Sequence, residues 1–69
     1  MATNNEKLGK KIQKIRKERG YTQEDLAEKL NISRTHMGHI EQGRKSASLE
    51  LLQRLSKVLK TKIADILPF

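Results

Sequence analysis

One short segment of the chain, residues 33–42, carries side chains suited to hydrogen bonding with nucleic acid. On a helix that turns by about 100° per residue, Met37 and Ile40 fall on the same side, and we expect both to face inward. The opposite side carries a guanidinium, a hydroxyl, an imidazole, a carboxamide and a glycine, contributed by Arg34, Thr35, His39, Gln42 and Gly38. Such groups can pair with base edges and phosphates, so this side is a candidate DNA-reading face. The alternative is a solvated helix face with no partner.

The sequence offers no set of residues for catalysis or for metal binding. Cysteine is absent, which excludes disulfides and thiolate zinc sites. The two histidines, His36 and His39, do not have the i,i+4 spacing of helical metal ligands, and neither a Ser-His-Asp set nor a glycine-rich phosphate loop is present. We therefore expect no enzymatic activity, cofactor, metal or small-molecule ligand. His36 lies at the edge of the inward side and is interpreted as a packing or phosphate-contacting residue.

Two short helices joined by a tight turn are predicted to position the candidate face. Thr22 is a helix N-cap candidate, and Asp25 supplies the reciprocal partner of a capping box. Asn31, which tolerates left-handed backbone, interrupts the helical pattern before a second cap candidate, Ser33. The predicted helices are residues 23–30 and 34–42, and Gly43 suits the left-handed position that ends the second one.

Amphipathic segments on both sides of this pair predict the scaffold. We expect a first helix at 6–19, capped by Asn4 or Asn5, a fourth at 49–59, capped by Ser48, and a last short one at 63–67. Apolar residues at helical spacing are interpreted as the core; in the first and fourth helices these are Leu8, Ile12, Ile15, Leu49, Leu52, Leu55, Val58 and Leu59. The fold class is therefore all-α, with residues 1–69 forming one domain.

The charge distribution favours a polyanionic partner. The chain carries 15 Lys and Arg against eight Asp and Glu, a net charge of +7. Residues 1–20 hold seven positive and two negative charges, residues 21–41 two and four, and residues 42–69 six and two, so the basic charge brackets the candidate face. Nucleic acid is the first candidate and anionic membrane the lesser one. With a single Tyr and a single Phe there is no platform for stacking unpaired bases, which favours duplex DNA.

The apolar runs are too short for a membrane span or a signal peptide, the longest being pairs such as Leu51-Leu52. We expect a cytoplasmic protein that does not contact membrane.

Four segments in order, with short connections, resemble one known family. LGKKIQKIRKERG, TQEDLAEKL, ISRTHMGHIEQG and SLELLQRLSKVL with its IADIL tail are similar to the phage-repressor and Cro type of helix-turn-helix domain, also called the xenobiotic-response-element family. The resemblance covers residues 8–67. It implies a five-helix bundle in which the helix from Ser33 to Gln42 enters the DNA major groove and the helix from Gln23 to Leu30 lies across the backbone. The family often has Pro where this chain has Ala47, and a small capping residue where it has Lys62.

The resemblance, combined with the outward face, assigns roles to individual residues. The expected base contacts are Ser33, Arg34, Thr35, Gly38 and His39. The expected backbone contacts are Lys10, Thr22, Gln23, His36, Arg44, Lys45 and Ser46. The resemblance also implies a structural salt bridge between Arg16 and Glu41, and the alternative is two unrelated surface charges.

The sequence therefore predicts a sequence-specific double-stranded-DNA-binding transcriptional regulator, acting as a homodimer on a palindromic operator. The candidate dimer contact is an apolar patch at the chain end, formed by Ile63, Ile66 and Phe69, and a frayed tail is the alternative. A second hypothesis keeps the fold but makes it an antitoxin-like protein-interaction module, with a protein as its main partner. A third is a charge-driven binder of any nucleic acid.

Overall fold

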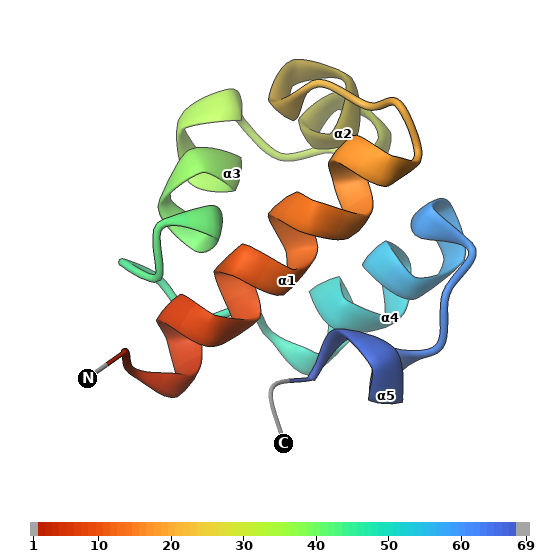
Figure 1. The fold of residues 1–69 in the computed structure, drawn as a ribbon. Coiled ribbons are helices and arrows are strands. Elements are labelled where there is room, and N and C mark those ends of the chain that lie inside the picture. The colour runs from red at the N-terminus through yellow and green to blue at the C-terminus, as the bar shows by residue number, and fades with distance from the viewer. Residues whose placement is uncertain (1, 68–69) are drawn as a thin grey trace.

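In the computed structural model, which describes residues 2–67, the chain forms five helices, and the all-α prediction is confirmed. The helices are α1 (Asn4–Glu18), α2 (Gln23–Leu30), α3 (Arg34–Glu41), α4 (Leu49–Leu59) and α5 (Ile63–Ile66). Figure 1 shows α1 running across the middle of the molecule, with α3 on one side and α4 and α5 on the other. The bounds of α2 and α4 match the sequence prediction, whereas α3 and α5 each end one residue earlier than expected.

Side-chain caps fix where the two central helices begin. At α2, the hydroxyl of Thr22 accepts a hydrogen bond from the Asp25 N–H at 3.0 Å, and the Thr22 N–H donates to Asp25 Oδ2 at 3.1 Å. At α3, Ser33 Oγ accepts from the His36 N–H at 3.0 Å. The predicted left-handed residue between the two helices is Asn31, with φ of 58°. These local contacts stabilise the helix ends and set the turn between α2 and α3.

The first helix begins earlier than predicted, and its predicted caps were wrong. Thr3 caps α1 in place of Asn4 or Asn5, because its hydroxyl accepts from the Glu6 N–H at 3.1 Å while its own N–H donates to Glu6 Oε1 at 2.9 Å. Neither asparagine has an acidic or amide residue three positions later, so neither can complete this reciprocal pair. Consequently α1 starts at Asn4 and ends at Glu18.

The core is closed by apolar side chains from all five helices. Leu49, which the sequence placed in this core, is 66% exposed, whereas Leu51 is buried. The reason is geometric: on α4, Leu51 lies about 40° from the buried Leu55 and Leu49 about 120° from it. The buried apolar residues are Leu8, Ile12, Ile15, Leu26, Ala27, Leu30, Met37, Ile40, Leu51, Leu52, Leu55, Leu59 and Ile66.

A glycine that the sequence analysis did not single out allows α1 to approach α3 closely. A side chain at Gly9 would overlap the backbone carbonyls of Ile40 and Glu41, so the last turn of α3 lies directly against the α1 backbone. Just beyond α3, Gly43 has φ of 77°, and a side chain there would overlap Glu6 of α1. The end of α3 is therefore held by main-chain contact as well as by side-chain packing.

Within residues 2–67, no helix combines the length and the apolar character that crossing a membrane requires.

Candidate nucleic-acid interface

The outward side of α3 forms part of an open depression on the surface. Arg34 and Thr35 lie exposed in the first turn of α3, and His39 is half-buried one turn further along. Gln23, from the start of α2, and Arg44, from the loop after α3, border the same depression. Its full lining is Gln23, Arg34, Thr35, His39, Gln42 and Arg44. Three elements thus bring guanidinium, carboxamide, hydroxyl and imidazole groups together, on a face with no carboxylate among the lining residues.

The other residues assigned from the sequence lie outside that lining. Lys10, Thr22, Ser33, Lys45 and Ser46 are exposed. Gly38 and His36 are half-buried on α3. The hydroxyls of Thr22 and Ser33 each accept a helix-capping bond, so each retains its O–H as a donor and one lone pair as an acceptor toward an external group.

The N-terminus of α2 presents donors next to the depression. The first N–H groups of a helix have no partner within the helix, and those of Gln23 and Glu24 have none among the rest of the described chain. The side chain of Asp25 is committed to the cap, and the bond that it accepts from the Thr22 N–H, with a second contribution from the Thr22 hydroxyl, lowers the pKa of its carboxyl. The α2 terminus can therefore donate main-chain hydrogen bonds to a phosphate.

A buried ion pair holds the end of α3 to α1. Arg16 Nε donates to Glu41 Oε2 at 2.7 Å and Arg16 Nη2 to Glu41 Oε1 at 3.1 Å, with the two side chains only 7% and 1% exposed. Arg16 Nη1 also donates to the Tyr21 carbonyl oxygen at 2.8 Å. The pair that the resemblance implied is present and is bidentate, a geometry that fixes orientation as well as distance.

The sequence analysis missed a third member of this cluster, Gln23. Its Nε2 donates to Glu41 Oε1 at 3.0 Å, so α1, α2 and α3 meet at one carboxylate. No local pattern in the sequence indicates this contact, because Gln23 and Glu41 are separated by 18 positions.

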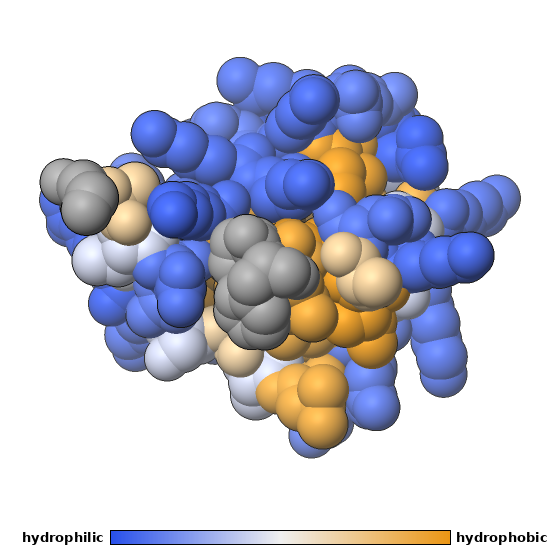
Figure 2. All heavy atoms as spheres, turned by 60° about the horizontal axis from the view of Figure 1, so that its bottom comes forward, coloured by the Kyte–Doolittle hydropathy of each residue, from blue (hydrophilic) through white to orange (hydrophobic). Residues whose placement is uncertain are grey.

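The apolar patch proposed for the chain end needs correction. Ile66 is fully buried in the core, so it is not available for contact with a second molecule, while Ile63 is half-buried and Phe69 lies outside the described residues. The exposed large apolar side chain among the described residues is Leu49, at the start of α4. Figure 2 looks onto the end of the molecule that carries α5 and shows apolar side chains surrounded by hydrophilic ones.

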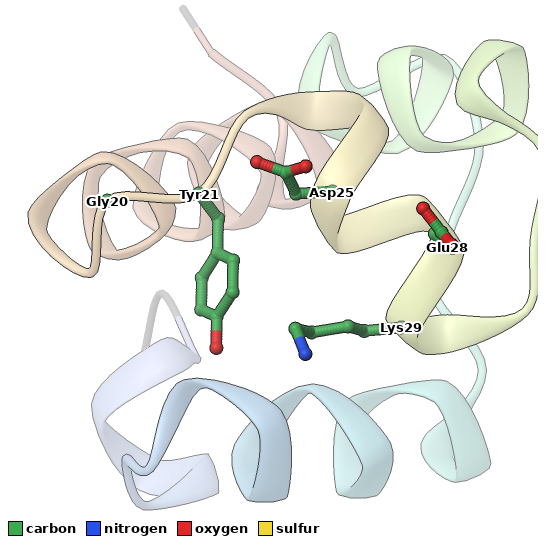
Figure 3. A pocket seen from close by; sticks show the side chains of 5 residues that line it. All are labelled: Gly20, Tyr21, Asp25, Glu28 and Lys29. Atoms are coloured by element: carbon green, nitrogen blue, oxygen red, sulfur yellow. The ribbon is translucent and has the colours of Figure 1, made fainter.

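A second hollow has a different character. It is bordered by Gly20, Tyr21, Asp25, Glu28 and Lys29, and Figure 3 shows the Tyr21 ring and the Lys29 side chain pointing into it. Lys29 Nζ lies 5.7 Å from the centre of the Tyr21 ring, within the range of a cation–π contact. The two carboxylates would repel phosphates, so this hollow is not suited to nucleic acid. Among residues 2–67 no cluster of potential ligands could hold a metal ion.

Comparison with known proteins places this arrangement among regulators. A family model described as Helix-turn-helix matches residues 12–66. In sequence, the chain is 41% identical over 59 residues to the immunity repressor protein of Bacillus phage phi105, an alignment that covers 86% of this chain and 41% of the repressor. The chain therefore spans less than half the length of that relative.

Two solved structures are similar over nearly the whole chain. The clp gene regulator ClgR from Corynebacterium glutamicum superposes with a TM-score of 0.90 at 32% identity, covering 94% of this chain and 69% of that chain. SinR, a master regulator for biofilm formation crystallised in complex with DNA, superposes with a TM-score of 0.79 at 30% identity, covering 86% of this chain and 95% of that chain.

Proposed function

This chain belongs to the helix-turn-helix family, and we propose that it acts as a transcriptional regulator by binding specific sequences of double-stranded DNA. The resemblance to phage-repressor and Cro domains is confirmed by the family match and the relatives. Those relatives are regulators rather than enzymes, in agreement with the expectation that this chain is not an enzyme.

The observation that carries the proposal is the depression on α3 that is lined together by Arg34, Thr35 and His39. Arg34 and Thr35 lie in the first turn of the helix, the part that reaches deepest into a major groove, and His39 follows one turn later. Arg34 can donate two hydrogen bonds to guanine O6 and N7, and Thr35 can offer its methyl group to thymine or its hydroxyl to a base edge. We propose that these three residues, with Ser33 and Gly38 beside them, read the bases.

Main-chain and basic groups around the depression are proposed to hold the phosphates. The free N–H groups of Gln23 and Glu24 begin α2, and Arg44 and Lys45 follow directly after α3. This pairing of a helix N-terminus with flanking cations is a common phosphate-binding arrangement. Lys10, Thr22, His36 and Ser46 complete the proposed backbone contacts.

We propose that two copies bind a palindromic site, with Leu49 in their contact. The molecule measures 30 by 24 by 22 Å, so two copies side by side can place their α3 helices one DNA turn apart, about 34 Å. Leu49 is 66% exposed at the start of α4, and the half-buried Ile63 and Leu67 lie at the start of α5 and directly after it. Leu49→Asp should then shift the protein toward monomer in sedimentation equilibrium without lowering the unfolding midpoint of the monomer. An unchanged dimer would exclude this contact.

Selection of bound duplexes from a random pool tests the proposed function. A sequence-specific dimer should return a consensus with two inverted half-sites. A set of sequences without consensus would favour charge-driven binding of any nucleic acid. Failure to enrich any duplex would favour a protein-interaction module, in which Arg34, Thr35 and His39 should tolerate substitution without loss of function.

A further inference from the structure

The side chain of Gln23 lies between the buried ion pair and the proposed reading face. Its Nε2 is 3.0 Å from Glu41 Oε1, and the same carboxylate oxygen accepts from Arg16 Nη2 at 3.1 Å. The other end of the carboxamide, Oε1, borders the open side of α3. One amide therefore connects a buried charge to the surface on which we propose that DNA binds.

The ion pair fixes which end of the amide faces outward. If the amide were turned over, its carbonyl oxygen would lie against a carboxylate oxygen, and two acceptors in contact repel each other. The Glu41 side chain is 1% exposed, so water cannot screen that repulsion. Arg16 holds the orientation of the carboxylate by donating two hydrogen bonds to it. The nitrogen of Gln23 must point to Glu41, and its oxygen must point away.

The outward oxygen lies above the middle of α3, where the helix has no side chain. A Cβ built on Gly38 would lie 3.9 Å from Gln23 Oε1, and no other atom of residues 2–67 lies within 4 Å once the two adjacent residues and the local backbone of α3 are set aside. Arg34 and Thr35 flank the same depression one turn earlier, and His39 follows Gly38 directly. The face thus presents donors from Arg34 and, over Gly38, an acceptor with a fixed direction.

We propose that Gln23 is a specificity-determining residue whose outward oxygen accepts a hydrogen bond from an exocyclic amino group in the major groove. The groups that fit are adenine N6 and cytosine N4, while guanine O6 and thymine O4 would be disfavoured. Glu41 and Arg16 act as positioning residues through the Gln23 amide. This inference rests on the proposed function and adds to the expectation that Gln23 contacts the DNA backbone, since its main-chain N–H and the second hydrogen of its Nε2 remain available for that contact.

The test compares Gln23→Met, which keeps the side-chain length but removes the acceptor, with the unchanged protein on the selected operator. In the unchanged protein, replacing the contacted adenine by purine, or the contacted cytosine by 2-pyrimidinone, should weaken binding roughly 2- to 12-fold, the range for one hydrogen bond. Gln23→Met should cause a loss of similar size on the natural duplex and show no further loss on the analogue. Gln53→Met, an exposed change on α4, is the matched control and should alter neither value.

The positioning role has its own measurement. Glu41→Gln keeps the shape but removes the charge that orients the amide, so it should relax preference at the same base pair as Gln23→Met. Its effect should not add to that of Gln23→Met in the double variant, and thermal unfolding checks that both variants remain folded at the binding temperature.

Three results separate the possibilities. If Gln23→Met weakens all duplexes equally, its side chain is a backbone contact and the inference is wrong. If Gln23→Met leaves the preference at every position intact, the oxygen reads nothing and the inference is also wrong. A pool selection that returns no consensus for the unchanged protein would instead refute the proposed function.

Discussion

Gly38→Ala offers a test in which stability and DNA binding should change in opposite directions. Gly38 is the fifth of eight residues in α3, and its backbone does not need the left-handed conformation that Gly43 adopts. The added methyl group would meet Gln23 Oε1 at 3.9 Å, an ordinary van der Waals distance. Nothing within the described protein therefore opposes the substitution.

The magnitude follows from helix propensity. Alanine is more favourable than glycine in a helix interior by about 1 kcal/mol, and part of this gain can be lost by desolvation of the neighbouring amide. We expect the free energy of unfolding to rise by about 0.5 to 1 kcal/mol. For a domain of 69 residues, the upper value corresponds to an increase in Tm of roughly 4 to 8 °C. If α3 approaches the DNA closely at this point, the same methyl group should weaken operator binding by about tenfold or more, since tenfold corresponds to roughly 1.4 kcal/mol.

Thermal unfolding by circular dichroism and titration of a labelled operator duplex measure the two effects on one sample. Gly9→Ala is the matched control, because its methyl group would overlap the carbonyls of Ile40 and Glu41 and should lower Tm steeply. A Gly38→Ala variant that is less stable than the parent would show that the space above Gly38 is not open. A variant that is more stable but binds DNA equally well would refute close approach of α3 at this residue.

Further predictions concern the ion pair, the DNA contacts and the α2 cap. Glu41→Ala should cost on the order of 3 kcal/mol in urea unfolding by leaving the Arg16 charge buried, whereas the exposed Glu28→Ala should cost under about 0.5; equal midpoints would contradict the pairing. Lys45→Ala should weaken all duplexes alike and reduce the logarithmic salt slope by about 1, while Arg34→Ala should relax preference at one base pair per half-site by roughly 1 to 3 kcal/mol and leave the slope nearly unchanged. Arg34 would be a phosphate contact if its variant behaved like that of Lys45. Because the Asp25 pKa is lowered on folding, its contribution to stability should be present above its unfolded pKa, about 3.9, and be lost as the pH falls through the folded value. Asp25→Asn should flatten the pH dependence of Tm in that acidic range, and an unchanged profile would exclude the cap as its source.

Features with a local cause were predictable from the sequence. The caps at Thr22, Ser33 and Ser48 each depend on residues within three positions, and the structure has all three. Amphipathic spacing likewise identified most of the buried side chains, because periodicity reports which side of a helix is apolar. The cap at Thr3 has the same kind of local signal, the spacing of Thr3 and Glu6, but the adjacent asparagines are competing cap candidates in the sequence.

Features that depend on how helices meet were not predictable from local pattern. Gly9 looks like an unfavourable helix residue until α3 is placed against it, and its contact with Ile40 joins positions far apart in the chain. Leu49 is apolar, as core residues are, but it lies at the edge of the apolar side of α4. Its exposure therefore depends on how α4 is rotated against the other helices. The Gln23 contact with Glu41 follows only once the start of α2 is placed against the end of α3. The Arg16–Glu41 pair was accessible only through the family resemblance.

The division of α3 into two sides suggests how new DNA targets could arise on this scaffold. Met37, Ile40 and Glu41 attach the helix to the domain, whereas Arg34 and Thr35, on the other side, are exposed and make no side-chain hydrogen bond or ion pair within residues 2–67. Mutation at the outward positions can therefore explore new operators while the bundle stays intact, which is a favourable situation for rapid divergence among duplicated regulators. A library that randomises positions 34, 35 and 39 should retain a large fraction of folded members, and it should yield altered specificities without compensating changes elsewhere in the domain.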